Sequence, residues 1–188
     1  MKLWKSVTVR GLVLALAVAA LMFAGGASTA FADAASSQSC TPWSAGSGSG
    51  AGVMHMQCTF HNATAVVNDS AIPCGPYAGQ PATLTLTYNG VFNVTMLTSG
   101  AGANTFWATG TQTGSFFAQP ADPSAPTYTG HFTAWFGDNN NLHNGSETST
   151  FTVHATGSDG SSFNFHDVTH MSVSASGISF FFDKPTCS

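Results

Sequence analysis

Asp167 stands out in this 188-residue chain because its position predicts apolar neighbours for a carboxylate. In the run FNFHD at positions 163–167, every second residue of a strand points to the same side, so Asp167 shares its face with two phenylalanines. Pairing with the preceding strand places Phe151 opposite. A carboxylate in such surroundings must be hydrogen-bonded, protonated or hydrated. It would suit a ligand cavity, or general acid chemistry if burial raises its pKa. The simpler alternatives are a bulge that turns it outward, or hydrogen bonds from Thr169 and backbone amides.

Three histidines in the same part of the chain, His154, His166 and His170, raise a metal-binding hypothesis. His166 and His170 share a strand face but lie about 13 Å apart, at about 3.3 Å per residue, which is too far to bind one ion. His154 and His166 are diagonal neighbours on adjacent strands, about 7 to 8 Å apart, and supply only two ligands. We therefore expect a hydrogen-bonded or solvated histidine face, with no metal and no cofactor.

Other chemistry-bearing residues give weaker signals. The Asn-rich segment 138–145 departs from the calcium-loop pattern, because its glycine comes too late and Leu142 falls where a ligand is required. We interpret it as a turn. Trp107 and Trp135 suggest a sugar-stacking platform or the wall of a hydrophobic pocket. No G-x-S-x-G motif occurs and paired carboxylates are scarce, so the sequence carries neither a hydrolase nor a glycosidase signature.

The charge balance excludes two classes of partner. Beyond its first 32 residues the chain keeps a single basic residue, Lys184, against eight acidic residues and seven histidines. So few basic groups cannot neutralise a run of phosphates, which excludes nucleic acids and disfavours anionic membranes. The same composition leads us to hypothesise tolerance of acidic surroundings, because few positive charges accumulate as the pH falls.

Residues 1–32 have the features of an export signal. Three basic residues precede an apolar run at positions 12–23, which is too short to span a bilayer. The sequence AFA at positions 30–32 fits the cleavage pattern that follows such runs. We expect the mature chain to begin at Asp33, to be secreted and extracellular, and to have no membrane association after cleavage.

Four cysteines, Cys40, Cys58, Cys74 and Cys187, remain in the mature chain, and an oxidising destination favours two disulfides. Their spacing contains no C-x-x-C motif, which argues against a zinc or redox site. Three pairings are possible. We favour Cys74 with Cys187, because these residues flank the predicted sheet and a closed sheet brings its first and last strands together. Cys40 would then pair with Cys58. The larger loop would contribute roughly 4 to 5 kcal/mol.

The remaining chain divides into a leader and one domain. Residues 33–52 are rich in Ala, Ser and Gly and are predicted to be a flexible leader, whereas residues 53–188 are predicted to form a single β domain. In that domain Thr, Val and Phe alternate in short runs between Gly, Asn and Pro, which is typical of antiparallel strands. Strands are expected at 53–61, 105–113, 115–119 and 128–136, with loops at 119–127 and 137–145.

Three hairpins follow from the pairing of apolar positions. A loop at Tyr88-Asn89-Gly90 would place Gly90 in the left-handed position of a bulge. Turns at 158–160 and 176–177 would make the last third of the chain a three-stranded meander. The predicted apolar pairs are Leu84 with Val94, Leu86 with Phe92, Val153 with Phe165, Ala155 with Phe163, Met171 with Phe182, Val173 with Phe180 and Ala175 with Ile178.

These elements predict an all-β, disulfide-stabilised fold of about eight antiparallel strands. An up-and-down β-barrel and a two-sheet β-sandwich both fit this count. We favour the barrel because the connections that can be argued are hairpins between sequential strands.

Three runs in the domain carry a resemblance to known proteins. They are YNGVFNVT at 88–95, YTGHFTAWFG at 128–137 and GSDGSSFNFHDV at 157–168. The region from Cys74 to Cys187 resembles uncharacterised small secreted β-proteins of soil bacteria. The resemblance implies an extracellular bacterial origin and β structure, and that family has no assigned activity.

The sequence therefore predicts a secreted β-barrel that is non-enzymatic and binds a small apolar or amphipathic ligand, or serves a structural role. The candidate binding residues are Asp167, Phe151, Phe165, Trp107 and Trp135. Pockets typically combine apolar walls with a few polar groups, which is the combination predicted around Asp167. One alternative is a barrel-type cyclase or lyase that uses Asp167 as acid or base. Another is a module that binds cell-wall polysaccharide or other carbohydrate through the two tryptophans.

Overall fold

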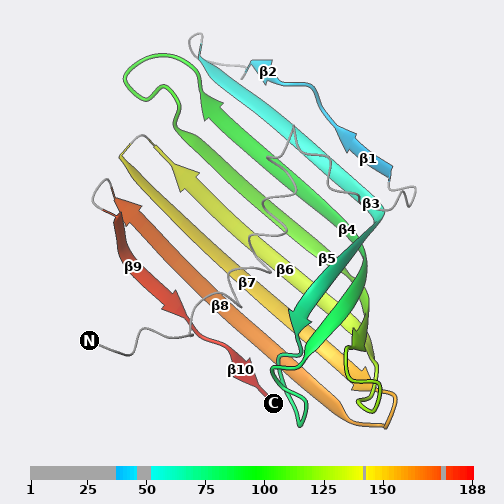
Figure 1. Ribbon diagram of the computed structural model, residues 1–188. Helices are drawn as coiled ribbons and strands as arrows, with labels where there is room; N and C mark the ends of the chain where they lie inside the picture. Colours follow the sequence, from blue (N-terminus) through cyan, green and yellow to red (C-terminus); the bar gives the residue numbers. More distant parts are fainter. Residues whose placement is uncertain (1–36, 46–51, 142, 175–176) are drawn as a thin grey trace.

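A computed structural model describes residues 37–45, 52–141, 143–174 and 177–188. This part of the chain forms one antiparallel sheet and contains no helix (Figure 1). Its strands are β1 (Ser37–Cys40), β2 (Ser44–Ala45), β3 (Val53–Ala71), β4 (Pro81–Leu97), β5 (Phe106–Pro120), β6 (Tyr128–Asn140), β7 (Asn144–Gly157), β8 (Ser162–Ser174), β9 (Gly177–Asp183) and β10 (Thr186–Cys187).

The strands from β3 to β8 pair in chain order as an up-and-down meander. The short strands β1 and β2 both pair with the outer edge of β3, and β9 and β10 both pair with the outer edge of β8. The all-β antiparallel class expected from the sequence is thus confirmed. The described strands do not close on themselves, because β1 and β10 lie at opposite ends of the strand order, and they form one sheet rather than two.

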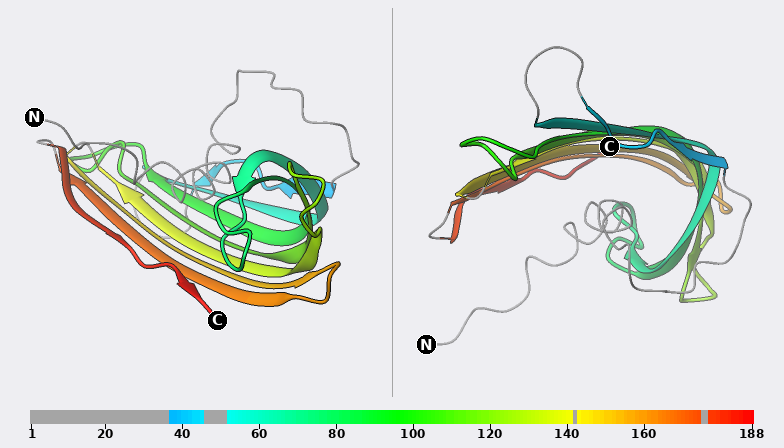
Figure 2. Two further views of the ribbon diagram at one scale, coloured as in Figure 1. Left: turned by 60° about the horizontal axis from the view of Figure 1, so that its bottom comes forward. Right: turned by 90° about the horizontal axis from the view of Figure 1, so that it is seen from above.

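The sheet curls strongly at one end (Figure 2). Two bulges interrupt the pairing of β3 with β4, between Phe60 and Ala63 and between Val67 and Ser70. Asn62 and Asp69, which lie in these bulges, adopt positive φ angles of 49° and 56°. Because a bulge bends the strand that contains it and increases its local twist, these two sites account for the bend of β3.

The curl gives the sheet a concave face, on which the main hydrophobic core lies. The face that carries Leu84, Leu86 and Tyr88 of β4 is called the concave face. The opposite face, which carries Thr83, Thr85 and Thr87, is called the polar face. The β3–β4 connection folds against the concave face at the curled end, so that Ile72 and Cys74 join the core. The buried residues of this core are Ile72, Cys74, Ala82, Ala118, Tyr128, Phe132, Val153, Ala155 and Phe163.

A second, smaller cluster lies on the concave face farther from the curl. It consists of Cys58, Phe92, Val94 and Ala108. Phe136 packs against this cluster, and its ring covers Gly110 on the adjacent strand, where an added Cβ would lie only 2.2 Å from the ring.

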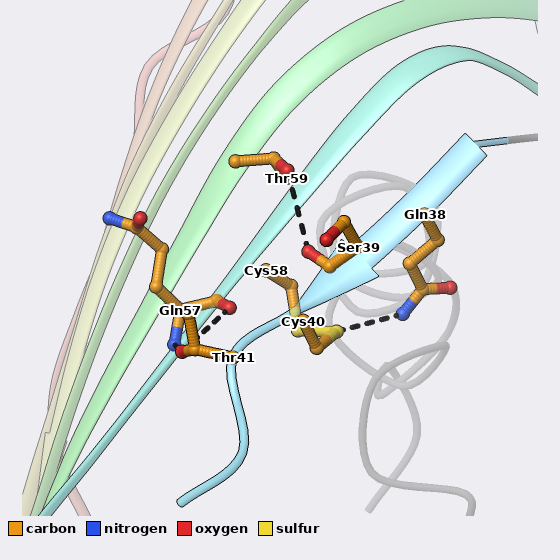
Figure 3. The surroundings of a disulfide bond; sticks show 7 residues. All are labelled: Gln38, Ser39, Cys40, Thr41, Gln57, Cys58 and Thr59. Carbon is orange, nitrogen blue, oxygen red and sulfur yellow. Dashed lines mark hydrogen bonds between the residues drawn. A yellow bond between two sulfur atoms is a disulfide. The ribbon is translucent and has the colours of Figure 1, made fainter. Parts of the chain in front are cut away.

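Both disulfides favoured from the sequence are present. Cys40 and Cys58 are directly opposite each other on β1 and β3, so this bond fastens the short edge strand to its neighbour (Figure 3). Thr41 reinforces the attachment, because its hydroxyl accepts a hydrogen bond from the backbone N–H of Gln57 at 2.9 Å. Within the predicted leader, therefore, residues 37–40 and 44–45 pair with β3.

Cys74 bonds to Cys187 and joins the β3–β4 connection to β10. The predicted pairing is right, although it does not join the first strand to the last strand of a closed barrel. It bridges a hairpin connection and an edge strand that the curl brings together.

The hairpin predicted at Tyr88-Asn89-Gly90 is wrong, since β4 runs through it without a turn. Gly90 lies opposite Gln112, where an added Cβ would lie 2.8 Å from a carbonyl oxygen of β5. Gly114 is similar: it lies within β5, and an added Cβ would lie 2.1 Å from the carbonyl oxygen of Thr87. Both glycines therefore permit close approach of neighbouring strands, and the predicted strands 105–113 and 115–119 are one strand.

The meander predicted for the last third of the chain is confirmed as β7, β8 and β9. The β7–β8 register agrees with the prediction, with Val153 opposite Phe165 and Ala155 opposite Phe163. The β8–β9 register differs from the prediction. Val173 lies opposite Ile178, two residues from its predicted partner, and beyond the irregularity between Ser172 and Val173, Met171 lies opposite Phe181, one residue from its predicted partner. The predicted pair of Ala175 with Ile178 lies outside the described residues.

The loop predicted at 137–145 is shorter than expected, because β6 extends to Asn140 and β7 begins at Asn144. The side chain of Asn141 stabilises the tight connection by accepting hydrogen bonds from the backbone N–H groups of His143 and Asn144. The Asn-rich segment is therefore a turn between two long strands, as interpreted from the sequence.

Candidate functional site

The carboxylates of β6 to β9 lie on the concave face. Asp138 of β6 lies directly opposite Glu147 of β7. Asp167 of β8 lies opposite Phe151, and Asp183 of β9 lies opposite Thr169. Since side chains alternate along a strand, all four acidic residues share the face that carries the hydrophobic core. The prediction that Asp167 shares the face of Phe163 and Phe165 agrees with this register.

Asp167 and Asp183 form a close pair around Thr169. The Thr169 hydroxyl lies 3.5 Å from Oδ2 of Asp167 and 3.3 Å from Oδ1 of Asp183, and it has one proton to donate between them. Oδ1 of Asp167 is excluded from solvent and has no hydrogen-bond donor. Two ionised carboxylates are both acceptors, so this pair needs a proton or an external donor.

The electrostatics of the pair agree with this geometry. Burial raises the pKa of Asp167 to about 6, with further contributions from the negative charge of Asp183 and from a hydrogen bond between the two carboxyls. That hydrogen bond requires a proton on one partner. Without that proton the two carboxyls are acceptors of like charge side by side, with Asp167 half-buried and Asp183 exposed.

The other two concave carboxyls have raised pKa values for the same reason. Burial raises the pKa of Asp138 and of Glu147, and the charge of Asp138 raises the pKa of Glu147 further. In the connecting loops the direction is reversed. Hydrogen bonds from Ser124 lower the pKa of Asp122, and hydrogen bonds from Ser161 lower the pKa of Asp159.

Aromatic rings flank Asp167 on the concave face. Phe151 and Phe165 meet edge to face with ring centroids 6.4 Å apart, and Phe132 lies 5.9 Å from Phe151. Three of the five predicted binding residues, Asp167, Phe151 and Phe165, thus come together. Phe181 of β9 lies opposite Met171 of β8 and extends the apolar surface. Its side chain is 41% exposed.

Trp107 and Trp135 do not join this group. They lie on the polar face, with 44% and 40% of their surfaces exposed. The five predicted binding residues therefore belong to two separate surfaces.

Sequence reasoning missed Asp183 as the partner of Asp167. The predicted β8–β9 register placed Asp183 on the same side as His170, whereas the irregularity beside Ser172 shifts it opposite Thr169. A one-residue shift moves every side chain to the other face of a sheet, and the sequence of the hairpin does not reveal the irregularity.

The three histidines of the metal hypothesis each contact a polar neighbour on the polar face. His154 contacts Asn164 at 2.5 Å, His166 contacts Thr152 at 2.9 Å, and His170 contacts Thr148 at 2.7 Å. Each pair lies directly opposite in the β7–β8 register. Within the described ranges, no group of three or more His, Cys, Asp or Glu side chains is arranged to hold a metal ion.

The polar face also carries an open hollow of about 650 Å³ at β5 to β8. Gly130 forms part of its floor, where an added Cβ would lie 1.9 Å from the carbonyl oxygen of His154. The polar-face side chains that line it are all polar, whereas the side chains of Phe116 and Ala155 belong to the main core on the concave face. The residues around the hollow are Ser115, Phe116, Thr129, Gly130, His131, His154, Ala155, Thr156, Ser162 and Asn164.

Searches of protein-family models, curated proteins and solved structures found no match for this chain. The described residues contain no helix that is long and apolar enough to cross a membrane. The two disulfides are consistent with an extracellular protein.

Proposed function

We propose that this is a secreted, non-enzymatic binding protein whose concave face holds a small amphipathic ligand. The observation that carries the proposal is the pair Asp167 and Asp183, which share the Thr169 hydroxyl as a donor beside the phenylalanines of the concave face, while Oδ1 of Asp167 has no donor. Two adjacent carboxylates that share one donor cost free energy, and a ligand that donates hydrogen bonds to the pair would recover part of it. The sheet curls at one end, and its strand order is open (Figure 2).

The charge of the site favours a ligand with a cationic head group. Asp167 and Asp183 place two carboxyls side by side, and a cation donating to both carboxyls would relieve their repulsion. The apolar part of the ligand would then lie on the half-buried Phe151 and Met171 and on the exposed ring of Phe181. This combination of aromatic and carboxylate groups suits an alkylamine.

An extracellular location is part of the same proposal. The export signal expected at residues 1–32 and the two disulfides both support it. The resemblance to secreted β-proteins of soil bacteria points to the same compartment.

Three ligands with one chain length and different head groups test the proposal. Isothermal titration at pH 7.5 would compare decylamine, decanol and decanoate, each below its critical micelle concentration. We expect decylamine to bind most tightly and decanoate least tightly. Replacing Asp167 by Asn should weaken decylamine binding about tenfold, the effect of losing one charge-assisted hydrogen bond, and should leave decanol binding nearly unchanged.

Asp122→Asn is the matched control, because it removes the same charge from an exposed loop and retains the acceptor that Ser124 uses. The proposal is wrong if none of the three ligands binds, or if the Asp122 and Asp167 variants weaken decylamine binding equally.

A catalytic role for the same pair is the second candidate, and the presence of Asp183 beside Asp167 favours it. Two adjacent carboxyls with one raised pKa can divide the roles of acid and base, as a cyclase or lyase would require. The Asp167→Asn variant separates the two cases when the ligand is incubated with the protein and analysed by mass spectrometry. A catalyst loses product formation and keeps binding, whereas a binding protein forms no product with either variant.

A further inference from the structure

The polar face of β4 to β8 is large, regular and free of permanent charge. The pairing of these five strands has no register shift, so its alternation can be followed without interruption. The outward positions carry mainly Thr, Ser, Asn, Gln and His, and no Asp, Glu, Lys or Arg lies among them. Thr113, Thr133 and Thr152 lie directly opposite one another on β5, β6 and β7. Such a surface complements an uncharged, hydroxyl-rich partner rather than an ionic one.

Two tryptophans on this face are exposed, although tryptophan side chains are usually buried. Trp107 of β5 is 44% exposed and Trp135 of β6 is 40% exposed. Trp135 lies opposite Thr111, and its indole extends over Gly137, where an added Cβ would lie 3.0 Å from Cη2. The ring therefore leans along β6 toward the row that holds Trp107 and Asn139.

The tryptophans and the hollow lie along one line. Trp135, Thr133, His131 and Thr129 follow one another at alternate positions of β6, and the last two line the hollow. Trp135 and His131 are four residues apart, or about 13 Å at about 3.3 Å per residue. A polymer that follows β6 would thus meet exposed indole rings first and then a polar hollow in which Asn164 orients His154.

We propose that the polar face binds an uncharged, extended polysaccharide of the β-linked glucan or chitin type. The rings of such a polymer present apolar C–H faces that stack on Trp107 and Trp135, and equatorial hydroxyls or amides that hydrogen-bond to Thr133 and to the lining of the hollow. The hydroxyl, amide and imidazole groups of this face both donate and accept hydrogen bonds, as sugar hydroxyls require. This surface is opposite the concave face, so the inference does not depend on the ligand proposed there.

Adsorption of the full mature chain to insoluble polysaccharides tests the inference. Binding isotherms on microcrystalline cellulose and on chitin, with polystyrene beads as a non-carbohydrate solid, would be measured at low salt and in 1 M NaCl. We expect saturable binding to at least one polysaccharide, little binding to polystyrene, and no loss in high salt, because the face is uncharged. The better of the two polysaccharides identifies the class of polymer.

Single substitutions locate the binding surface. Trp107→Ala and Trp135→Ala should each lower the association constant about tenfold, the effect expected when an aromatic anchor of an interface is truncated. Trp43→Ala is the matched control, since Trp43 is also a tryptophan, is 41% exposed, and lies outside β4 to β8. Gly137→Ala keeps both rings and shifts the indole of Trp135, so it should give a smaller loss. Circular dichroism would show that each variant is folded.

Four results would overturn the inference. They are the absence of saturable binding to either polysaccharide, equal binding to polystyrene, release by 1 M NaCl, and equal losses in the Trp43 and Trp135 variants.

Discussion

The two faces of the sheet are built from the same strands and differ in nearly every physical property. The concave face carries the two apolar clusters and all the carboxylates of β6 to β9, whereas the polar face of β4 to β8 carries threonines, histidines and exposed tryptophans without a permanent charge. Alternation along each strand separates the two sets. Four of the eight acidic residues lie on the face that carries the apolar clusters, and burial raises the pKa of three of them, Asp138, Glu147 and Asp167.

Of the changes considered on the concave face, removal of the disulfide between Cys74 and Cys187 should cause the largest loss of stability. The bond spans 113 residues, and replacing both cysteines by serine should lower the free energy of unfolding by about 4 to 5 kcal/mol. The same change at Cys40 and Cys58, which span 18 residues, should cost about 3 kcal/mol. Urea unfolding of the two double variants would measure the difference. A greater loss from the Cys40 and Cys58 variant would contradict this order.

Adjacent residues of β6 give the next test, because they point to opposite faces. Phe132 is buried in the main core, so Phe132→Ala should lower the free energy of unfolding by about 3 to 5 kcal/mol. Thr133→Ala removes a side chain from the polar face and should change it by no more than about 0.5 kcal/mol. Chemical unfolding of both variants is the measurement, and similar losses would mean that the polar face is also packed.

Substitutions at two glycines that are covered by aromatic rings, one on each face, should give smaller changes in the free energy of unfolding. Gly110→Ala would place a methyl group against the ring of Phe136 within the second cluster, and overpacking there should cost about 1 to 3 kcal/mol. Gly137→Ala should cost less than about 1 kcal/mol, because the exposed ring of Trp135 can move into solvent. Thermal unfolding would rank them, and the reverse order would show that Trp135 is held in place.

Asp167→Asn should have a smaller effect on the free energy of unfolding than the disulfide and core substitutions, and it should be stabilising. The pKa of Asp167 is about 6 in the folded chain and 3.8 as its ordinary value, so the folded state binds this proton more tightly. The contribution of Asp167 to the free energy of unfolding therefore falls as the pH rises from about 4 through 6. At pH 7.5 the substitution should add about 1 kcal/mol, after allowing for screening by water around a half-buried carboxyl, and near pH 4 the gain should vanish.

Asp122→Asn is the control for this pH dependence, since hydrogen bonds lower the pKa of Asp122 in the folded chain. It should not stabilise the protein at neutral pH. Unfolding free energies of both variants at pH 4 and pH 7.5 would be compared with those of the unmodified chain. A gain from Asp167→Asn that persists at pH 4 would show that the carboxyl charge is not its cause.

Local patterns in the sequence predicted the parts of the fold that depend on two neighbouring strands. The turn at 158–160 and the register of β7 with β8 were predicted because the alternation is strict on both sides and the turn residues fit. The pairing of the cysteines was also predicted. The position of Asp167 opposite Phe151 followed directly from that register.

Features that depend on a third strand or on a bulge were not predicted. The sequence Asn89-Gly90 is a strong hairpin signal in isolation, but β3 and β5 both pair along this part of β4, and Gly90 serves close packing instead. The partnership of Asp183 with Asp167 depends on an irregularity in β8–β9 pairing. The curl of the sheet depends on the bulges in β3.

The arrangement of the short strands has a consequence for self-assembly. An open sheet exposes unpaired backbone groups at both edges, and a long exposed edge is a template for fibril growth. Here β1 and β2, of 4 and 2 residues, are the outermost strands beside the 19-residue β3. On the other side β9 and β10, of 7 and 2 residues, flank the 13-residue β8. A disulfide anchors one short strand at each edge. Each edge of the sheet therefore consists of short, interrupted strands, along which an incoming chain cannot form a long, continuous ladder of hydrogen bonds.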